Sequence, residues 1–270
     1  MAKSVLITGA TDGLGLATAR RLVEAGHHVL LHGRNPSKLA DATNSVSSAS
    51  GDARVSGYLA DLSRMTEVEA LAKEVTDKHT NLDVLINNAG VYSAGDLTTA
   101  DGLDVRFAVN TIAPYALTQR LLPLIGPSGR VINLSSAAQA PVDLHALAGR
   151  VKLSGDGAAY AQSKLALTMW SRVLGLRFKD EGPAIIAVNP GSMLGTKMVK
   201  NAFGVAGADI GIGAEILTRA ALADDFAAAS GQYFDNDEGR FSSPHDDALD
   251  PEKSEQTVRA IEAVLADLQT

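Results

Sequence analysis

Residues 5–15 read VLITGATDGLG, an apolar run followed by a turn with three glycines and the start of a helical pattern. Glycines in such a turn let the chain reverse tightly and let backbone N–H groups approach a phosphate closely. The N-terminus of the helix that follows favours negative charge. The stretch therefore predicts a strand, a turn and a helix, with Gly9, Gly13 and Gly15 shaping a site for the phosphates of a dinucleotide. A turn with a structural role only is the alternative.

Short apolar runs and longer helical patterns alternate along the rest of the chain, which is typical of βαβ units and a parallel sheet. We expect strands at Val5–Thr8, Val29–His32, Val55–Ala60, Leu82–Ile86, Val131–Leu134, Ala184–Val188 and Gln232–Phe234. We expect helices at Leu14–Ala25, from Asn35-Pro36, after a Ser63 cap, at Leu103–Leu122, Ala159–Phe178 and Gly213–Leu222, and from Asp250-Pro251. Ser45–Ser50 is interpreted as a helix end and loop. No linker or repeat divides the pattern, so we predict a single doubly wound, Rossmann-like α/β domain over residues 1–270, with helices on both faces of the sheet.

Composition excludes several functions. The chain has a formal charge of −7, so we expect no broad attraction to nucleic acid or to an anionic membrane. It has no cysteine, which excludes disulfides, thiolate nucleophiles and cysteine-ligated metals. The histidines show no ligand spacing, and residues 235–239 (DNDEG) are interpreted as a solvated acidic loop, so no metal site is predicted. Because only three residues precede the first strand and no apolar run reaches the ~18 residues of a membrane span, we expect a soluble cytoplasmic protein.

Four motifs, taken in order and spacing, carry a family resemblance. They are TGATDGLG at 8–15, NNAG at 87–90, YAQSK at 160–164 and the Pro190-Gly191 pair. Over most of its length the chain resembles the single-domain short-chain dehydrogenase/reductase family, nearest its retinol-dehydrogenase-like and carbonyl-reductase branch. The resemblance implies reversible hydride transfer between a nicotinamide dinucleotide and a carbonyl or alcohol, here an apolar aldehyde or ketone. The dinucleotide is then expected on Gly9, Thr11, Asp12, Gly13, Leu14, Gly15, Arg34, Asp61, Leu62, Asn88, Ala89, Gly90, Tyr160, Lys164, Pro190 and Gly191.

The residues at the end of the second strand indicate which dinucleotide binds. An NAD enzyme usually has an acidic residue there that accepts from the ribose hydroxyls, whereas an NADP enzyme has an arginine nearby that accommodates the 2′-phosphate. This chain has Gly33 and then Arg34, whose guanidinium suits a 2′-phosphate, and Lys38 follows one helical turn later. Asp12 stands where many NADP members have a second basic residue. We predict NADP, with NAD as the alternative.

Tyr160 and Lys164 are four residues apart on a predicted helix, so their side chains share one face. A free tyrosine has a pKa near ~10, and a neighbouring ammonium favours its phenolate. Tyr160 is therefore the predicted general acid and base. By resemblance, Ser136, in preference to Ser135, polarises the substrate carbonyl, Lys164 also holds the nicotinamide ribose, and Asn110 interrupts a helix to hold a water that relays protons.

Two departures from many relatives and one candidate lid lie near the predicted catalytic residues. The spacing from Ser136 to Tyr160 is longer, which defines an insertion at 139–157 that we expect to line the substrate pocket. Residues 192–213 are rich in glycine and are a candidate mobile lid. Thr196 lies one residue further from Pro190-Gly191 than the usual threonine, which puts its nicotinamide contact in doubt.

Two further questions stay open at this point. Relatives commonly pair through the helices that carry Asn110 and Tyr160, and the apolar positions Leu165, Met169, Trp170 and Val173 suit such a face. We expect a homodimer or homotetramer, with a monomer as the alternative. A dinucleotide-sensing binding protein is the rival function, and a sugar-nucleotide epimerase is a weaker one because it needs a longer substrate domain.

Overall fold

The computed structural model describes residues 1–49 and 54–269, so Ser50, at the end of the predicted loop, lies outside the described residues. Its strands are β1 (Ser4–Ile7), β2 (His28–Gly33), β3 (Val55–Leu59), β4 (Val84–Asn87), β5 (Arg130–Leu134), β6 (Ala184–Asn189), β7 (Tyr233–Asp235) and β8 (Arg240–Ser242). They form one sheet in the order β3-β2-β1-β4-β5-β6-β7-β8, parallel throughout except that β8 is antiparallel to β7. The predicted doubly wound, Rossmann-like fold in a single domain is confirmed.

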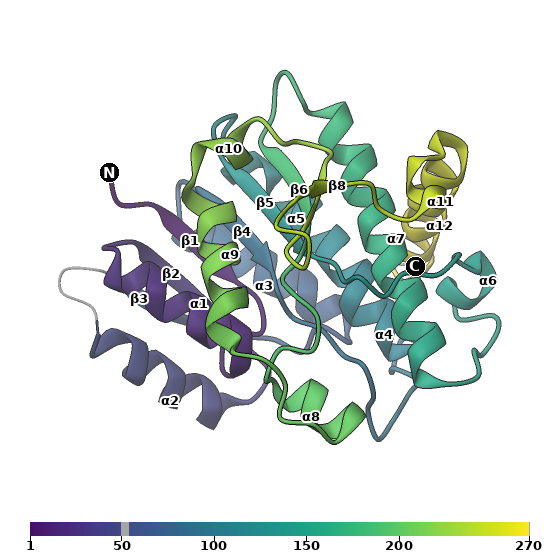
Figure 1. Cartoon of the computed structure of the whole chain (residues 1–270), viewed down its shortest axis with the longest axis horizontal. Helices are drawn as coiled ribbons and strands as arrows, with labels where there is room; N and C mark the ends of the chain where they lie inside the picture. Colours follow the sequence, from purple (N-terminus) through teal and green to yellow (C-terminus); the bar gives the residue numbers. More distant parts are fainter. Residues whose placement is uncertain (50–53, 270) are drawn as a thin grey trace.

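Helices cover both faces of the sheet (Figure 1). They are α1 (Gly13–Glu24), α2 (Pro36–Ser47), α3 (Met65–Lys78), α4 (Val105–Phe107), α5 (Ala113–Leu121), α6 (Leu144–Leu147), α7 (Asp156–Arg177), α8 (Lys197–Phe203), α9 (Ile210–Leu222), α10 (Asp224–Ala227), α11 (Asp246–Leu249) and α12 (Pro251–Asp267). A π-helical turn, Ala108–Ile112, joins α4 to α5, and a 3-10 turn, Leu122–Leu124, follows α5. Within residues 1–49 and 54–269, no helix is long and apolar enough to cross a membrane.

Successive strand residues point to opposite faces of a sheet, so each strand supplies two cores. Leu6 and Leu85 belong to the core beneath α3, α5 and α7, whereas Val5 and Ile7 belong to the core beneath α1 and α9. Burial on both faces explains why the strands are continuous apolar runs. β1 lies between β2 and β4, which places the turn after β1 beside the carboxyl end of β4, where doubly wound folds bind ligands.

Two local predictions are corrected by the structure. Ser63 does not cap α3: the helix follows Arg64, and the N–H of Met65 donates to Asp101 Oδ2 at 2.8 Å. The cap comes from a residue distant in sequence, which local patterns do not reveal. The strand predicted at Gln232–Phe234 is not the last one, because the three-residue β8 pairs with it and is too short to show an alternating pattern.

The face of α7 predicted to meet a partner subunit is covered by the chain's own C-terminal helices. Leu165 and Met169 pack against Ala248 of α11, and Trp170 is fully buried in the core that α12 completes. On the adjoining α5, the Tyr115 hydroxyl donates to Glu262 of α12 at 2.7 Å. Figure 1 shows α11 and α12 beside α7. Leu165, Met169 and Trp170 are therefore covered within the chain and do not form an apolar surface for a second subunit. Local apolar periodicity does not show which segment covers a face, and the oligomeric state itself stays a prediction.

We expect the protein to be a monomer at micromolar concentration, because the apolar surface that would drive pairing through α5 and α7 is already buried within the chain. Light scattering on a size-exclusion column should give a mass near 28.0 kDa at every loading concentration. A mass of twice that value, stable on dilution, would show that a different surface forms a dimer.

Candidate functional site

A cavity of about 690 Å³ opens at the carboxyl ends of the parallel strands. Its wall is formed by the glycine turn after β1, the ends of β2, β3, β4, β5 and β6, the middle of α7, and α8. Every residue that the sequence assigns to the dinucleotide lies on this wall, as do Ser136, Tyr160 and Lys164. Asn110 lies behind the wall. Residues from across the chain thus meet at one site, as predicted, and their individual roles stay predictions.

The glycine turn is packed so closely that side chains are excluded from it. A Cβ on Gly9, whose φ is +64°, would lie 2.9 Å from Ala89 Cα, and a Cβ on Gly15 would lie 2.5 Å from Asn88 Nδ2. Asn88 Nδ2 also donates to the carbonyl oxygens of Thr8 and Gly9, at 2.7 and 3.0 Å. This amide joins the turn to the end of β4, so the backbone of the phosphate site is built before a ligand arrives.

The end of β2 is closely packed at Gly33. A Cβ on Gly33 would lie 2.3 Å from Thr11 Cγ2, so any larger residue there requires the Thr11 side chain to move. Arg34 and Lys38 follow as exposed side chains on the cavity wall, opposite Asp61 and Leu62 at the end of β3. Asp61 lines the cavity, and its Oδ1 also accepts from the Ser63 N–H at 3.0 Å, ahead of α3.

Tyr160 and Lys164 occupy the other end of the cavity, on the same face of α7. Lys164 is buried, and its Nζ donates to the carbonyl oxygen of Leu134 at 2.6 Å and lies 5.7 Å from the centre of the Tyr160 ring. Burial lowers the pKa of Lys164 to about 8. Burial raises the pKa of Tyr160, and a hydrogen bond with the Ser136 side chain opposes part of that rise. A Cβ on Gly90 would lie 3.7 Å from Lys164 Nζ, so the segment after β4 closes over the lysine.

The structure distinguishes the two serines at the end of β5. Ser135 is buried, and its hydroxyl is bonded to Thr168 Oγ1 at 2.6 Å. Ser136 lies on the cavity wall, and its hydroxyl faces Tyr160 as well as accepting from the Ala138 N–H at 3.1 Å. Both serines line the cavity, but the Ser135 hydroxyl is bonded to Thr168 and the Ser136 hydroxyl is not, so the preference for Ser136 stays a prediction that this geometry favours.

Asn110 lies in the π-helical turn, so the helix is interrupted where the sequence predicts. Its side chain is fully buried, with Oδ1 accepting from the Val91 N–H at 2.7 Å and Nδ2 donating to the Val91 carbonyl and to Ser163 Oγ, both at 2.9 Å. Asn110 therefore holds the segment that follows NNAG against α7. Its part in a proton relay stays a prediction.

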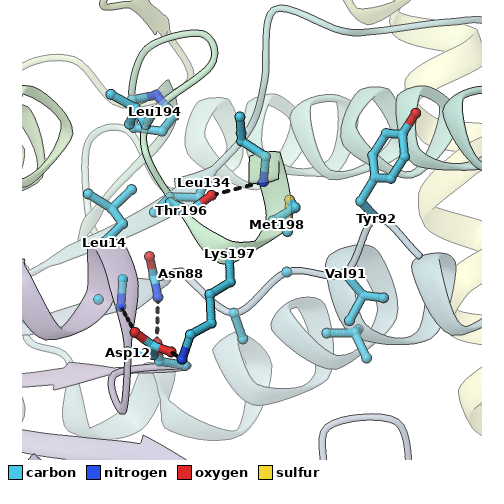
Figure 2. A pocket seen from close by; sticks show the side chains of 18 of the residues that line it. Asp12, Leu14, Asn88, Val91, Tyr92, Leu134, Leu194, Thr196, Lys197 and Met198 are labelled. Carbon is cyan, nitrogen blue, oxygen red and sulfur yellow. Dashed lines mark hydrogen bonds and ion pairs between the residues drawn. The ribbon is translucent and has the colours of Figure 1, made fainter. Parts of the chain in front are cut away.

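The candidate lid, residues 192–213, contains a helix that the sequence pattern did not reveal, α8. Thr196 caps α8 through its Oγ1, which accepts from the Val199 N–H at 3.3 Å. Lys197 of α8 forms an ion pair with Asp12 of the glycine turn, and Figure 2 shows this pair spanning from the lid to the turn. The positive charge that the glycine motif itself lacks is thus supplied from the lid.

Tyr92 and Phe203 form an apolar wall beside Tyr160 that sequence reasoning missed. The Tyr92 ring centre lies 5.2 Å from that of Tyr160 and 5.4 Å from that of Phe203. Figure 2 shows Tyr92 across the pocket from Asp12 and Lys197. Tyr92 lies two residues after the end of the NNAG motif, which was the available signal, whereas nothing local marked Phe203.

Two predictions about loops need correction. The insertion, residues 139–157, places only Gly157 on the cavity wall within the described residues, and its helix α6 packs against α12 instead. The acidic loop at 235–239 is not merely solvated. Asp237 accepts from the Ser192 N–H at 2.8 Å and from Asn189 Nδ2 at 2.9 Å, so it anchors the start of the lid. In both cases the partner is distant in sequence.

Comparisons with known proteins agree with this geometry. Residues 3–206 match the family model for short chain dehydrogenases. Retinol dehydrogenase 13 of Mus musculus is 32% identical over 262 residues, covering 90% of this chain and 78% of the relative. Among solved structures, an uncharacterized protein from Mycobacterium paratuberculosis superposes with a TM-score of 0.79 at 28% identity, covering 97% of this chain and 92% of that one. A short chain dehydrogenase from Shigella flexneri 2a, complexed with NADP, gives a TM-score of 0.68 at 26% identity, covering 87% and 97%.

The fold and site are those of a nicotinamide-dependent oxidoreductase. The sheet is Rossmann-like, Gly9 and Gly15 of the glycine turn leave no room for side chains, and a serine, a tyrosine and a lysine lie on one cavity wall. The chain belongs to the short-chain dehydrogenase family, in its retinol-dehydrogenase-like branch.

Proposed function

We propose that the protein is an NADP(H)-preferring oxidoreductase that interconverts an apolar aldehyde or ketone and its alcohol. The observation that carries the proposal is the convergence of Ser136, Tyr160 and Lys164 on the cavity that also contains the glycine turn. A dinucleotide-sensing protein would need the groups that bind the dinucleotide, but it would need neither a proton donor such as Tyr160 nor a serine beside it.

The chain's own residues fit a dinucleotide phosphate well. The first turn of α1 lies on the cavity wall, where the N–H groups at a helix N-terminus can meet a phosphate. Arg34 and Lys38 favour a 2′-phosphate at the other end, and Gly33 leaves no carboxylate to repel it. The NADP complex of the Shigella flexneri relative supports the same choice.

Each residue of the site has a separate role in the proposed reaction. A bound nicotinamide would supply the hydride in reduction and accept it in oxidation. The Ser136 hydroxyl donates a hydrogen bond to the carbonyl oxygen of the substrate and so stabilises the negative charge that develops there. Tyr160 delivers a proton to that oxygen in reduction and removes it in oxidation. Lys164 holds its positive charge beside Tyr160 and donates to the ribose hydroxyls, while Asn110 keeps the Val91–Tyr92 segment in place.

The chemistry of the wall favours an apolar substrate. Tyr92 and Phe203 present ring faces beside Tyr160, and Met198 and Val199 of α8 extend that surface. A polar sugar would lose hydration against these side chains without gaining hydrogen bonds in return.

The cytoplasmic location stays a prediction from the sequence.

The proposal is tested by following NADPH and NADH consumption with the purified protein across aldehydes, ketones and quinones. We expect turnover with NADPH and apolar carbonyl compounds. Binding of NADPH with no turnover on any member of the panel would favour the sensor.

Cofactor preference depends on Arg34. We expect Arg34→Ala to weaken NADPH binding by roughly 10- to 150-fold, since a charge-assisted hydrogen bond contributes ~1.5–3 kcal/mol, and to change NADH binding by much less. Dissociation constants for both dinucleotides come from fluorescence titration. Arg54→Ala, an exposed arginine before β3 and outside the cavity wall, is the control. Equal losses for both dinucleotides would contradict a 2′-phosphate contact.

A further inference from the structure

His32, at the end of β2, is a buried polar residue that neither the sequence motifs nor the proposed reaction uses. Its exposed fraction is 3%. It lies on the floor of the cavity, next to Gly33 and between the glycine turn and the end of β3. A histidine in such a position requires a partner for each ring nitrogen.

Both ring nitrogens have backbone partners on neighbouring strand ends. The Gly9 N–H donates to His32 Nδ1 at 3.1 Å, and His32 Nε2 lies 3.0 Å from the carbonyl oxygen of Ala60. Since Nδ1 accepts a hydrogen bond from the Gly9 N–H, the ring hydrogen is on Nε2, which donates to the carbonyl oxygen of Ala60. The backbone oxygen of His32 also accepts from the Ala10 N–H at 2.8 Å. One residue therefore connects the ends of β1, β2 and β3.

These connections set the spacing of the two ends of the proposed dinucleotide site. Gly9 begins the turn for the phosphates, whereas Ala60 directly precedes Asp61 and Leu62, which are assigned to the adenine. The turn is also closely packed against the segment that follows β4, since a Cβ on Gly9 would lie 2.9 Å from Ala89 Cα. A protonated ring would direct a hydrogen at the Gly9 N–H. Burial opposes that state and lowers the pKa of His32 to about 4, so the ring stays neutral at physiological pH.

We propose that His32 is a positioning residue for the dinucleotide: its imidazole holds the phosphate turn at a defined distance from the adenosine end of the site. The role rests on the proposed function, because it presupposes that a dinucleotide binds there. His32 contacts no reacting atom, so it acts on cofactor affinity and leaves the chemical step unchanged.

Three variants separate the two hydrogen bonds from simple packing. His32→Leu removes both hydrogen bonds and fills the position with an apolar side chain of similar size. His32→Asn places Oδ1 where Nδ1 was, so it retains the acceptor for Gly9. His28→Leu is the matched control: it removes a histidine at the opposite end of the same strand, whose Nδ1 accepts from the Arg54 N–H at 2.9 Å, far from the cavity wall.

We expect His32→Leu to weaken NADPH binding by about 10- to 100-fold, the range for a buried N–H that loses its acceptor. His32→Asn should recover most of that loss, and His28→Leu should bind as the wild type does. At saturating NADPH, kcat should stay within about twofold of the wild type in all three variants. The His32 variants lose contacts that stabilise the bound cofactor equally in the ground state and the transition state, and His28→Leu loses none. Thermal unfolding of each variant shows whether it is folded.

Amide hydrogen exchange at Gly9 provides a readout that needs no cofactor. The Gly9 amide should exchange slowly in the wild type and in His32→Asn, and faster in His32→Leu. Equal affinity in the wild type and His32→Leu would overturn the proposal, as would equal losses in the Leu and Asn variants. If the wild type bound no dinucleotide, the proposed function would fail on that measurement alone, whatever the exchange rates of the His32 variants.

Discussion

Tyr160→Phe should abolish most carbonyl reduction while leaving NADPH binding nearly intact. The change removes one hydroxyl and keeps the ring, so the contacts with Tyr92 and the packing of α7 are preserved. The glycine turn and Arg34 are untouched. Loss of the proton donor should lower kcat by roughly 100- to 10,000-fold, the usual contribution of a general acid. Stopped assays of product, together with NADPH affinity by fluorescence, measure the two effects separately.

Tyr58→Phe is the matched control for this variant. It makes the same chemical change in β3, where the hydroxyl is bonded to His79 Nε2 at 2.6 Å on the far side of the sheet from α1 and outside the cavity wall. Its kcat should equal that of the wild type. A Tyr160→Phe variant that turned over at the wild-type rate would show that another group delivers the proton.

Lys164→Met should damage both cofactor binding and turnover, with kcat/KM for NADPH reduced by at least ~100-fold, because the change removes a donor for the ribose and the charge beside the catalytic acid. Methionine keeps much of the buried volume of the lysine, so packing against Leu134 is largely retained. Lys73→Met, an exposed lysine on α3 that pairs with Asp77, is the control and should have no effect. A Lys164→Met variant that lost kcat but kept its NADPH affinity would remove the ribose contact from the proposal.

The pKa of Lys164 also predicts the pH dependence of the wild type. A lysine with a pKa of about 8 is charged below that pH and becomes neutral above it, while the raised pKa of Tyr160 keeps the tyrosine protonated over the same range. The kcat/KM for NADPH in reduction, which reports groups of the free enzyme, should therefore fall as the pH rises through about 8. In Lys164→Arg the guanidinium stays charged, so this fall should disappear up to the pH at which the protein unfolds. A flat wild-type profile between pH 7 and about 9.5 would contradict the role of the ammonium.

Local sequence predicted most strands and helices of this protein and many of the residues that line its cavity. Continuous apolar runs specified buried parallel strands, since residues on both faces of such strands are covered. Asn35 and Pro36 specified the start of α2, and Asn35 Oδ1 does accept from the Lys38 N–H at 3.0 Å. Tyr160 and Lys164 lie on one face of α7 because four residues are close to one helical turn. These features depend on hydrogen bonds and periodicities within a few residues of each other, so they are visible in the sequence.

Contacts between distant segments decided the rest. The apolar face of α7 gave the same signal whether a second subunit or α12 covers it, and only the path of the C-terminal segment shows that α12 does. Ser135 and Ser136 are adjacent in sequence, and only the fold shows that the Ser135 hydroxyl is bonded to Thr168 whereas the Ser136 hydroxyl faces Tyr160. His32 resembles any residue of a buried strand until Gly9 and Ala60 are brought to its two ring nitrogens. Its role depends on partners 23 and 28 residues away, and only the folded sheet places them within hydrogen-bond distance.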